Sequence, residues 1–193
     1  MSRTLFQASF ISLGSLFIAA PALAHTGGTT EASLIAGLTH PLTGIDHLLA
    51  MFSIGIWAAM QHRTDHSKVP AVFLIMLMAG FLLGMNGLAI PFVEAGIASS
   101  VLIMGLAIVF ATKLPNAASL PLISLFALYH GTAHGFEIGI ANATYFAVGF
   151  ITSSALLNFA GVGFTKLTNQ LMPQLHRVVG SIIALAGFSF LIA

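Results

Sequence analysis

Long apolar runs separated by short polar stretches fill nearly all of the chain after residue 24. By residue number the runs lie at roughly 34–60, 70–90, 92–112, 118–139, 142–164 and 176–193. Each run is close to the ~20 residues that a helix needs to cross a bilayer. With 58% hydrophobic and only 6% charged residues, the chain has too few polar side chains to cover a soluble globule. The sequence therefore predicts an all-α polytopic membrane protein with about six transmembrane helices.

The first 24 residues have the features of a secretory signal peptide. Arg3 precedes an apolar run at 10–20, which is shorter than a span, and the small-residue triplet Ala22-Leu23-Ala24 follows. An uncleaved first transmembrane helix is the alternative, but the short run and the Ala-x-Ala site favour cleavage. We therefore expect a signal peptide at 1–24 and a six-helix membrane domain at 25–193, beginning with His25.

The positive charges predict the orientation of these helices. If cleavage leaves the mature N-terminus in the periplasm, the cytoplasmic loops are 61–69, 113–117 and 165–175. These loops and their flanking residues hold every Lys and Arg after residue 24, namely Arg63, Lys68, Lys113, Lys166 and Arg177, whereas the outer loops carry Glu31 and Glu94. Basic loops stay preferentially in the cytoplasm. We therefore expect a multi-pass protein of the bacterial inner membrane with both mature ends in the periplasm.

The composition also excludes several partners and cofactors. Six Lys and Arg residues in total form no basic stripe, which argues against nucleic-acid binding. The absence of cysteine excludes thiolate metal sites and disulfides. The chain has no Walker sequence, and its predicted cytoplasmic loops are too short for an ATPase domain. The expected partners are the lipid bilayer, a bound ion and, in a homo-oligomer, further copies of the chain.

Two clusters of ionisable residues lie inside the predicted helices. The first cluster is His40, Asp46 and His47, and the second is His130, His134 and Glu137. Ionisable side chains within a bilayer are costly unless something binds them, and imidazoles with carboxylates suit Ni2+, Co2+ or Zn2+. A polar packing network without an ion is the alternative. Six such residues in two short segments favour a divalent metal site.

The predicted topology brings the two clusters to similar depths. The first span runs inward, so His40 lies near its outer mouth and His47 about 10 Å deeper at ~1.5 Å per residue. The fourth span runs outward, so the second cluster occupies its outer half, with i, i+4, i+7 spacing on one helical face. His40 and His47 likewise lie seven residues apart. Two such faces would surround one ion.

Three further features are open to two interpretations each. His25, exposed by cleavage, would chelate metal at the periplasmic entrance through its imidazole and terminal amine, or it is an incidental residue of a frayed terminus. Glycine stripes on the second and fourth spans, at Gly80, Gly84 and Gly87 and at Gly131, Gly135 and Gly139, predict close helix packing over a gating role. Polar residues 152–154 and Asn158 either extend a polar path toward the cytoplasm or hydrogen-bond between helices.

The residues around the two clusters carry a family resemblance. The segment from His40 to Met51, His-Pro-Leu-x-Gly-x-Asp-His-x-Leu-Ala-Met, resembles the first-helix signature of the HupE/UreJ nickel/cobalt permeases. The segment from Tyr129 to Glu137 is similar to their second signature, Phe-His-Gly-x-x-His-Gly-x-Glu, with Tyr129 in place of the usual Phe. The resemblance implies secondary transport of Ni2+ or Co2+ into the cell. It also implies the metal residues His40, Asp46, His47, His130, His134 and Glu137.

The main alternative is an intramembrane metal-dependent hydrolase or oxidase that uses the same residues to activate water or dioxygen. The chain has no His-Glu-x-x-His or Gly-x-Ser-x-Gly motif, and His62 and His66 are too few for the histidine boxes of membrane di-iron oxygenases. A metal-sensing or chaperoning subunit without conduction is a third interpretation. We expect a permease rather than an enzyme, with a divalent metal ion as cargo and no prosthetic group.

Overall fold

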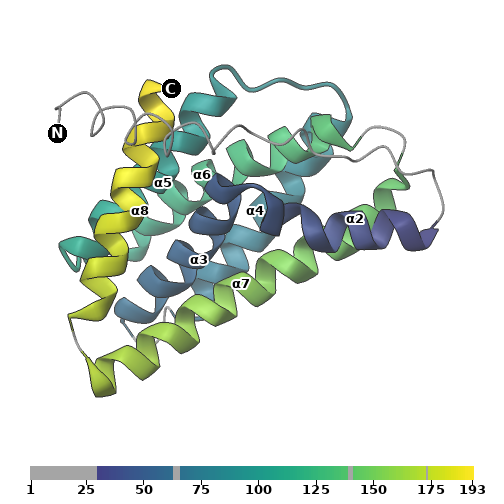
Figure 1. The fold of residues 1–193 in the computed structure, drawn as a ribbon. Coiled ribbons are helices and arrows are strands. Elements are labelled where there is room, and N and C mark those ends of the chain that lie inside the picture. The colour runs from purple at the N-terminus through teal and green to yellow at the C-terminus, as the bar shows by residue number, and fades with distance from the viewer. Residues whose placement is uncertain (1–29, 63–65, 139–140, 173) are drawn as a thin grey trace, which may run out of the picture.

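The computed structural model describes residues 30–62, 66–138, 141–172 and 174–193, and this part of the chain consists of α-helices and short connections, without strands. Its helices are α2 (Thr30–Thr43), α3 (Ile45–Met60), α4 (Lys68–Met85), α5 (Val93–Val109), α6 (Asn116–Glu137), α7 (Ala143–Leu171) and α8 (Leu175–Ile192) (Figure 1). The expected signal peptide at 1–24 and His25 lie outside the described residues. The all-α prediction is therefore confirmed for the described part.

Three helices, α4, α7 and α8, are long and apolar enough to cross a membrane by themselves. The pair α2 and α3 qualifies together as one bent span, which gives up to four spans among the described residues. α5 is shorter, at 17 residues, and α6 carries the second ionisable cluster within its 22 residues. The helices indicate a membrane protein, whereas the count of six spans is not confirmed.

The first predicted span, 34–60, is not one continuous helix. The chain turns by 80° between α2 and α3, where Gly44 has an extended backbone with φ −89° and ψ 114°. Pro41 and Gly44 are both poor helix formers, which explains why the helix breaks here. The expectation that His47 lies 10 Å below His40 on one helix axis is therefore wrong. The two histidines lie on opposite sides of a corner.

Two other helix boundaries differ from the prediction. α7 continues to Leu171 instead of ending at residue 164, so the expected loop at 165–175 is mostly helix. α4 ends at Met85 instead of residue 90, and Gly87 follows with φ +79°, a left-handed conformation that glycine adopts without steric cost. Gly87 therefore serves the turn after α4 and not the packing of the helix.

Glycines let the helices pack closely in pairs. On α4 and α6, a Cβ atom added to Gly80, Gly84, Gly131 or Gly135 would overlap backbone atoms of the facing helix. The prediction that these four glycines serve helix packing is confirmed, whereas Gly139 lies outside the described residues. α7 packs closely at two glycines in the same way, at Gly149 against α2 and at Gly161 against α3. It therefore runs along both arms of the corner, as Figure 1 shows.

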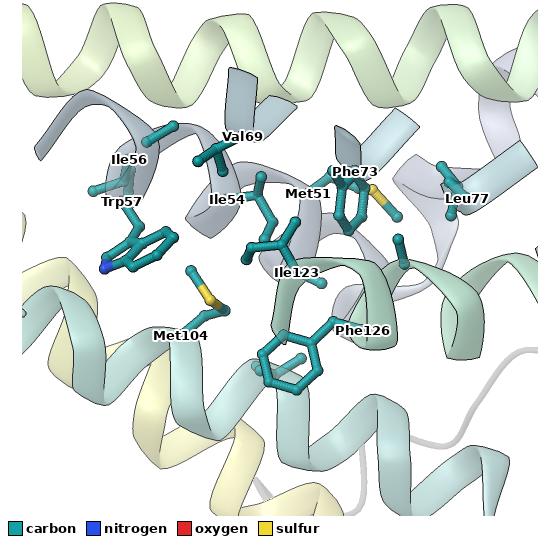
Figure 2. Packing of buried hydrophobic residues seen from close by; sticks show 14 of the residues in the cluster. Met51, Ile54, Ile56, Trp57, Val69, Phe73, Leu77, Met104, Ile123 and Phe126 are labelled. Carbon is teal, nitrogen blue, oxygen red and sulfur yellow. The ribbon is translucent and has the colours of Figure 1, made fainter. Parts of the chain in front are cut away.

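The centre of the bundle is an apolar core between α3, α4, α5 and α6. Its buried side chains include Met51, Trp57, Phe73, Leu77, Met104, Ile123 and Phe126 (Figure 2). At one end of this core, the Trp57 Nε1–H donates to the Thr112 carbonyl at 2.9 Å, and Gln61 donates to the same oxygen at 3.1 Å. These bonds tie the end of α3 to the α5–α6 connection. The ionisable clusters lie at the opposite end of α3.

Candidate metal centre

Three segments of the chain meet at one cavity of about 200 Å3. The end of α2 and the start of α3 supply the first cluster, and the last two turns of α6 supply most of the second. The residues that line the cavity are His40, Thr43, Gly44, Asp46, His47, Glu94, Ile97, Ala133, His134 and Glu137. His130 is fully buried on the same face of α6, one turn before His134. The structure thus brings together all six residues of the two clusters.

The outer group of the site consists of His40, His134 and Glu137. The His40 Nε2–H donates to Glu137 Oε2 at 3.0 Å, and His134 Nδ1 lies 3.6 Å from the same oxygen. One ligand atom from each residue lies within 4.8 Å of the others. Neighbouring ligands of a divalent ion with bonds of about 2.1 Å are about 3.0–3.4 Å apart. Small side-chain rotations would therefore let these three residues share one ion.

The inner group consists of Asp46, His47 and His130. Asp46 Oδ1 accepts the backbone N–H of His47 at 2.9 Å and the ring Nδ1–H of His47 at 3.0 Å. A carboxylate that holds one ring nitrogen in this way fixes the tautomer and presents the other nitrogen to a ligand. That other nitrogen, His47 Nε2, is buried and makes no hydrogen bond. Asp46 therefore orients His47 toward the interior of the site.

His134 links the two groups. Its ring centroid lies 4.5 Å from that of His40 and 4.1 Å from that of His47, and the residue is 1% exposed. Neither ring nitrogen of His134 makes a hydrogen bond, and His130 Nδ1 also lacks a partner. Buried polar atoms in folded proteins are nearly always paired. Unpaired nitrogens on three adjacent histidines therefore indicate a site for a ligand that accepts lone pairs.

Aromatic side chains of α7 form one wall of the site. The Phe150 ring centroid lies 4.3 Å from that of His134, and the Phe146 centroid lies 5.4 Å from that of His40. Phe81 of α4 stacks on Phe146 at 6.0 Å. All three phenylalanines are at most 1% exposed. This wall keeps water from the side of the histidines that faces away from the cavity, which strengthens electrostatic interactions there.

Two residues at the site were not predicted from the sequence. Glu94, in the first turn of α5, lines the cavity, although the sequence placed it only in an outer loop. Ser100, two turns further along α5, lies with its Oγ 2.8 Å from His130 Nε2. Neither residue belongs to a signature segment or has a regular spacing to one. The one available signal was that Glu94 is among only five acidic residues of the chain.

The charges around the cavity favour a cation. Three carboxylates line it, those of Asp46, Glu94 and Glu137, and its described lining contains no lysine or arginine. The basic residues Lys68, Lys113, Lys166 and Arg177 all belong to the ends or connections of helices at the other end of the bundle. A negative cleft of this kind raises the local concentration of cations.

The remaining sequence candidates lie elsewhere or play other roles. His66 is at the far end of α3, with Nε2 3.1 Å from the Gln61 carbonyl oxygen. On α7, the Ser154 hydroxyl donates to the Phe150 carbonyl and Asn158 Nδ2 donates to the Ser154 carbonyl. These two bonds stay within α7 and do not join helices. Asn158 Oδ1 is buried and unpaired, so a polar path along α7 stays a prediction.

Comparisons with known proteins show that the similarity to the family is not limited to the two signature segments but covers most of the chain. Residues 13–190 match the family described as HupE / UreJ protein. The chain belongs to the HupE/UreJ family. Among curated proteins, Protein HupE of Rhizobium leguminosarum bv. viciae is 36% identical over 183 residues, which covers 94% of this chain and 95% of that one. No solved structure matches. The family predicted from the signature segments is thus confirmed, and in this HupE/UreJ protein the same segments supply the imidazoles of the cavity.

Proposed function

We propose that the protein is a secondary transporter that moves Ni2+ or Co2+ through the site shared by the two clusters. The observation that carries the proposal is the contact between four histidine rings, each of which packs within 4.1–4.8 Å of a neighbour. Three of them, His47, His130 and His134, keep buried nitrogens without a hydrogen-bond partner. Two carboxylates, Asp46 and Glu137, complete the donor set. Imidazole and carboxylate together suit Ni2+, Co2+ and Zn2+.

The size and donor set of the cavity support transport over catalysis. At about 200 Å3 it is smaller than the ~300–1,000 Å3 of pockets that hold organic ligands, and it is large enough for an ion with water. A transport site must also release its ion, which a shell of mainly neutral imidazoles allows better than a thiolate cage would. These features favour a permease over the hydrolase or oxidase alternative.

The proposal includes a direction of transport. The bent pair α2–α3 and the helices α4 to α8 would make the six spans, following a signal peptide at 1–24, with both mature ends in the periplasm of a bacterial inner membrane. The basic residues at the end of the bundle opposite the cavity support this orientation through the positive-inside preference. The cavity would then open to the periplasm, and the ion would move inward.

The test is metal uptake by proteoliposomes that contain only this chain. We expect the wild type to accumulate Ni2+ or Co2+ and the His134→Ala variant to show none, because it removes the histidine that contacts both groups. His66→Ala is the matched control, since His66 lies at the other end of α3. Equal uptake by wild type and His134→Ala would refute the shared site. Metal binding without uptake by the wild type would favour the enzyme or the sensing subunit.

His25 is part of the proposal as a capture residue at the entrance. If cleavage follows Ala24, its terminal amine and imidazole would chelate one ion together. N-terminal sequencing of the mature protein and uptake by a His25→Ala variant test this role. A different first residue, or unchanged apparent affinity at low metal concentration, would exclude it.

A further inference from the structure

We propose that Ser100 fixes the tautomer of His130, so that this buried histidine presents Nδ1 to the metal ion. The inference rests on the proposed metal-binding role of the cavity. Ser100 belongs to neither signature segment, and it is on α5, whereas the six cluster residues are on α2, α3 and α6. Ser100 is 1% exposed and His130 is fully buried, so the hydrogen bond between them has no competition from bulk water.

The hydrogen-bond partners of Ser100 determine the direction of this bond. Ser100 Oγ lies 2.7 Å from the Ile97 carbonyl oxygen and 2.8 Å from His130 Nε2. A serine hydroxyl has a single hydrogen, and a carbonyl oxygen only accepts. Two oxygens at 2.7 Å without a hydrogen between them would repel each other. The Ser100 hydrogen therefore points to Ile97, and Ser100 Oγ accepts the Nε2–H of His130.

The consequence for His130 follows from the chemistry of the neutral imidazole ring. A ring protonated at Nε2 keeps its lone pair on Nδ1. His130 Nδ1 is the buried atom without a hydrogen-bond partner, and the His130 ring lies 4.8 Å from the ring of His47. His130 therefore has its free nitrogen prepared for a metal ion before the ion arrives.

Ser100 and Asp46 thus each accept a hydrogen bond from a histidine ring, but they leave different ring nitrogens free. Asp46 accepts from His47 Nδ1 and frees Nε2, whereas Ser100 accepts from His130 Nε2 and frees Nδ1. Partners of this kind fix the ring orientation of a ligand histidine and raise its basicity, and their loss typically weakens metal affinity by about 10- to 100-fold. Ser100 is a positioning residue, since it acts on the ion through His130.

The experiment uses the full-length protein labelled with 15N-histidine, without metal and after addition of Ni2+ or Co2+. We expect the 15N signals of His130 in the wild type to show the form protonated at Nε2. Ser100→Ala removes the acceptor, so His130 should lose this single tautomer and Ni2+ affinity should fall by about 10- to 100-fold. Ser100→Thr keeps a hydroxyl that donates to the preceding helical turn. It should keep the tautomer and an affinity within about threefold of the wild type. Ser181→Ala, a matched change on the exposed face of α8, should change neither.

Two results would overturn the inference. One is a wild-type His130 protonated at Nδ1 in the metal-free protein. The other is a Ser100→Ala variant with the tautomer and the metal affinity of the wild type. If the wild type binds neither Ni2+ nor Co2+, the proposed function fails instead, and the 15N signals of the metal-free protein still decide whether Ser100 sets the tautomer of His130.

Discussion

Gly44 offers a way to disturb the inner half of the site without removing any ligand. Its backbone, with φ −89° and ψ 114°, is one that alanine adopts without strain, so Gly44→Ala should keep the corner between α2 and α3. The added Cβ would lie 3.0 Å from Asp46 Oδ1 and 3.2 Å from His47 Nδ1. Both distances are shorter than ordinary van der Waals contact. The pair of side chains must therefore shift by a few tenths of an ångström.

The size of the effect follows from that shift. Holding a side chain about 30° away from its rotamer costs about 0.5–1.5 kcal/mol. If His47 must be strained in this way to reach the ion, metal affinity falls by about two- to tenfold, since ~1.4 kcal/mol corresponds to a factor of ten. The free energy of unfolding should change little. Replacing glycine reduces the conformational entropy of the unfolded chain, which stabilises the fold by about 0.4–1 kcal/mol and offsets the cost of the crowded Cβ.

Titration calorimetry with Ni2+ and thermal unfolding of the purified protein test this reasoning. Gly163→Ala on α7 is the matched control, because a Cβ there meets no atom within 4 Å. The control should keep wild-type affinity and gain slightly in stability. Wild-type affinity in Gly44→Ala would refute the reasoning, since it would mean that the Asp46–His47 pair does not contact the ion.

Three further predictions concern packing, protonation and entry. Gly135→Ala places a Cβ against the Phe81 carbonyl of α4, and the backbone of a packed helix cannot move aside as a flexible side chain can. The substitution should therefore destabilise the fold by about 1–3 kcal/mol, measured as a lower midpoint of thermal unfolding. Uptake should decline as the outer pH is lowered, because protons compete with the metal ion for the imidazole nitrogens of the site. A flat profile would mean that histidine ligation does not limit transport. Glu94→Gln should lower uptake at low metal concentration by roughly two- to fivefold, and added salt should reduce the difference by screening. An effect that does not depend on salt would contradict an electrostatic role of Glu94.

Much of the fold and of the candidate site was predictable from the sequence because the relevant signals are local. Long apolar runs predict transmembrane helices independently of the helices that pack against them. The spacing of His130, His134 and Glu137 places them on one face of a helix through the geometry of the helix alone. Glycines four residues apart predict close packing because they lack a Cβ, and Gly84 and Gly135 show this between α4 and α6.

The tertiary structure alone decided how these elements meet. Pro41 and Gly44 account locally for a break in the helix, but no local pattern of residues 34–60 sets the 80° angle between α2 and α3, both of which pack against α7. Ser100 and Glu94 join the site because α5 packs against α3 and α6, and neither has a sequence spacing that links it to a histidine. The sequence by itself determined the membrane helices, the family and the residue types of the site. The contacts that orient those residues arise between segments far apart in the chain, so they exist only once the helices have packed.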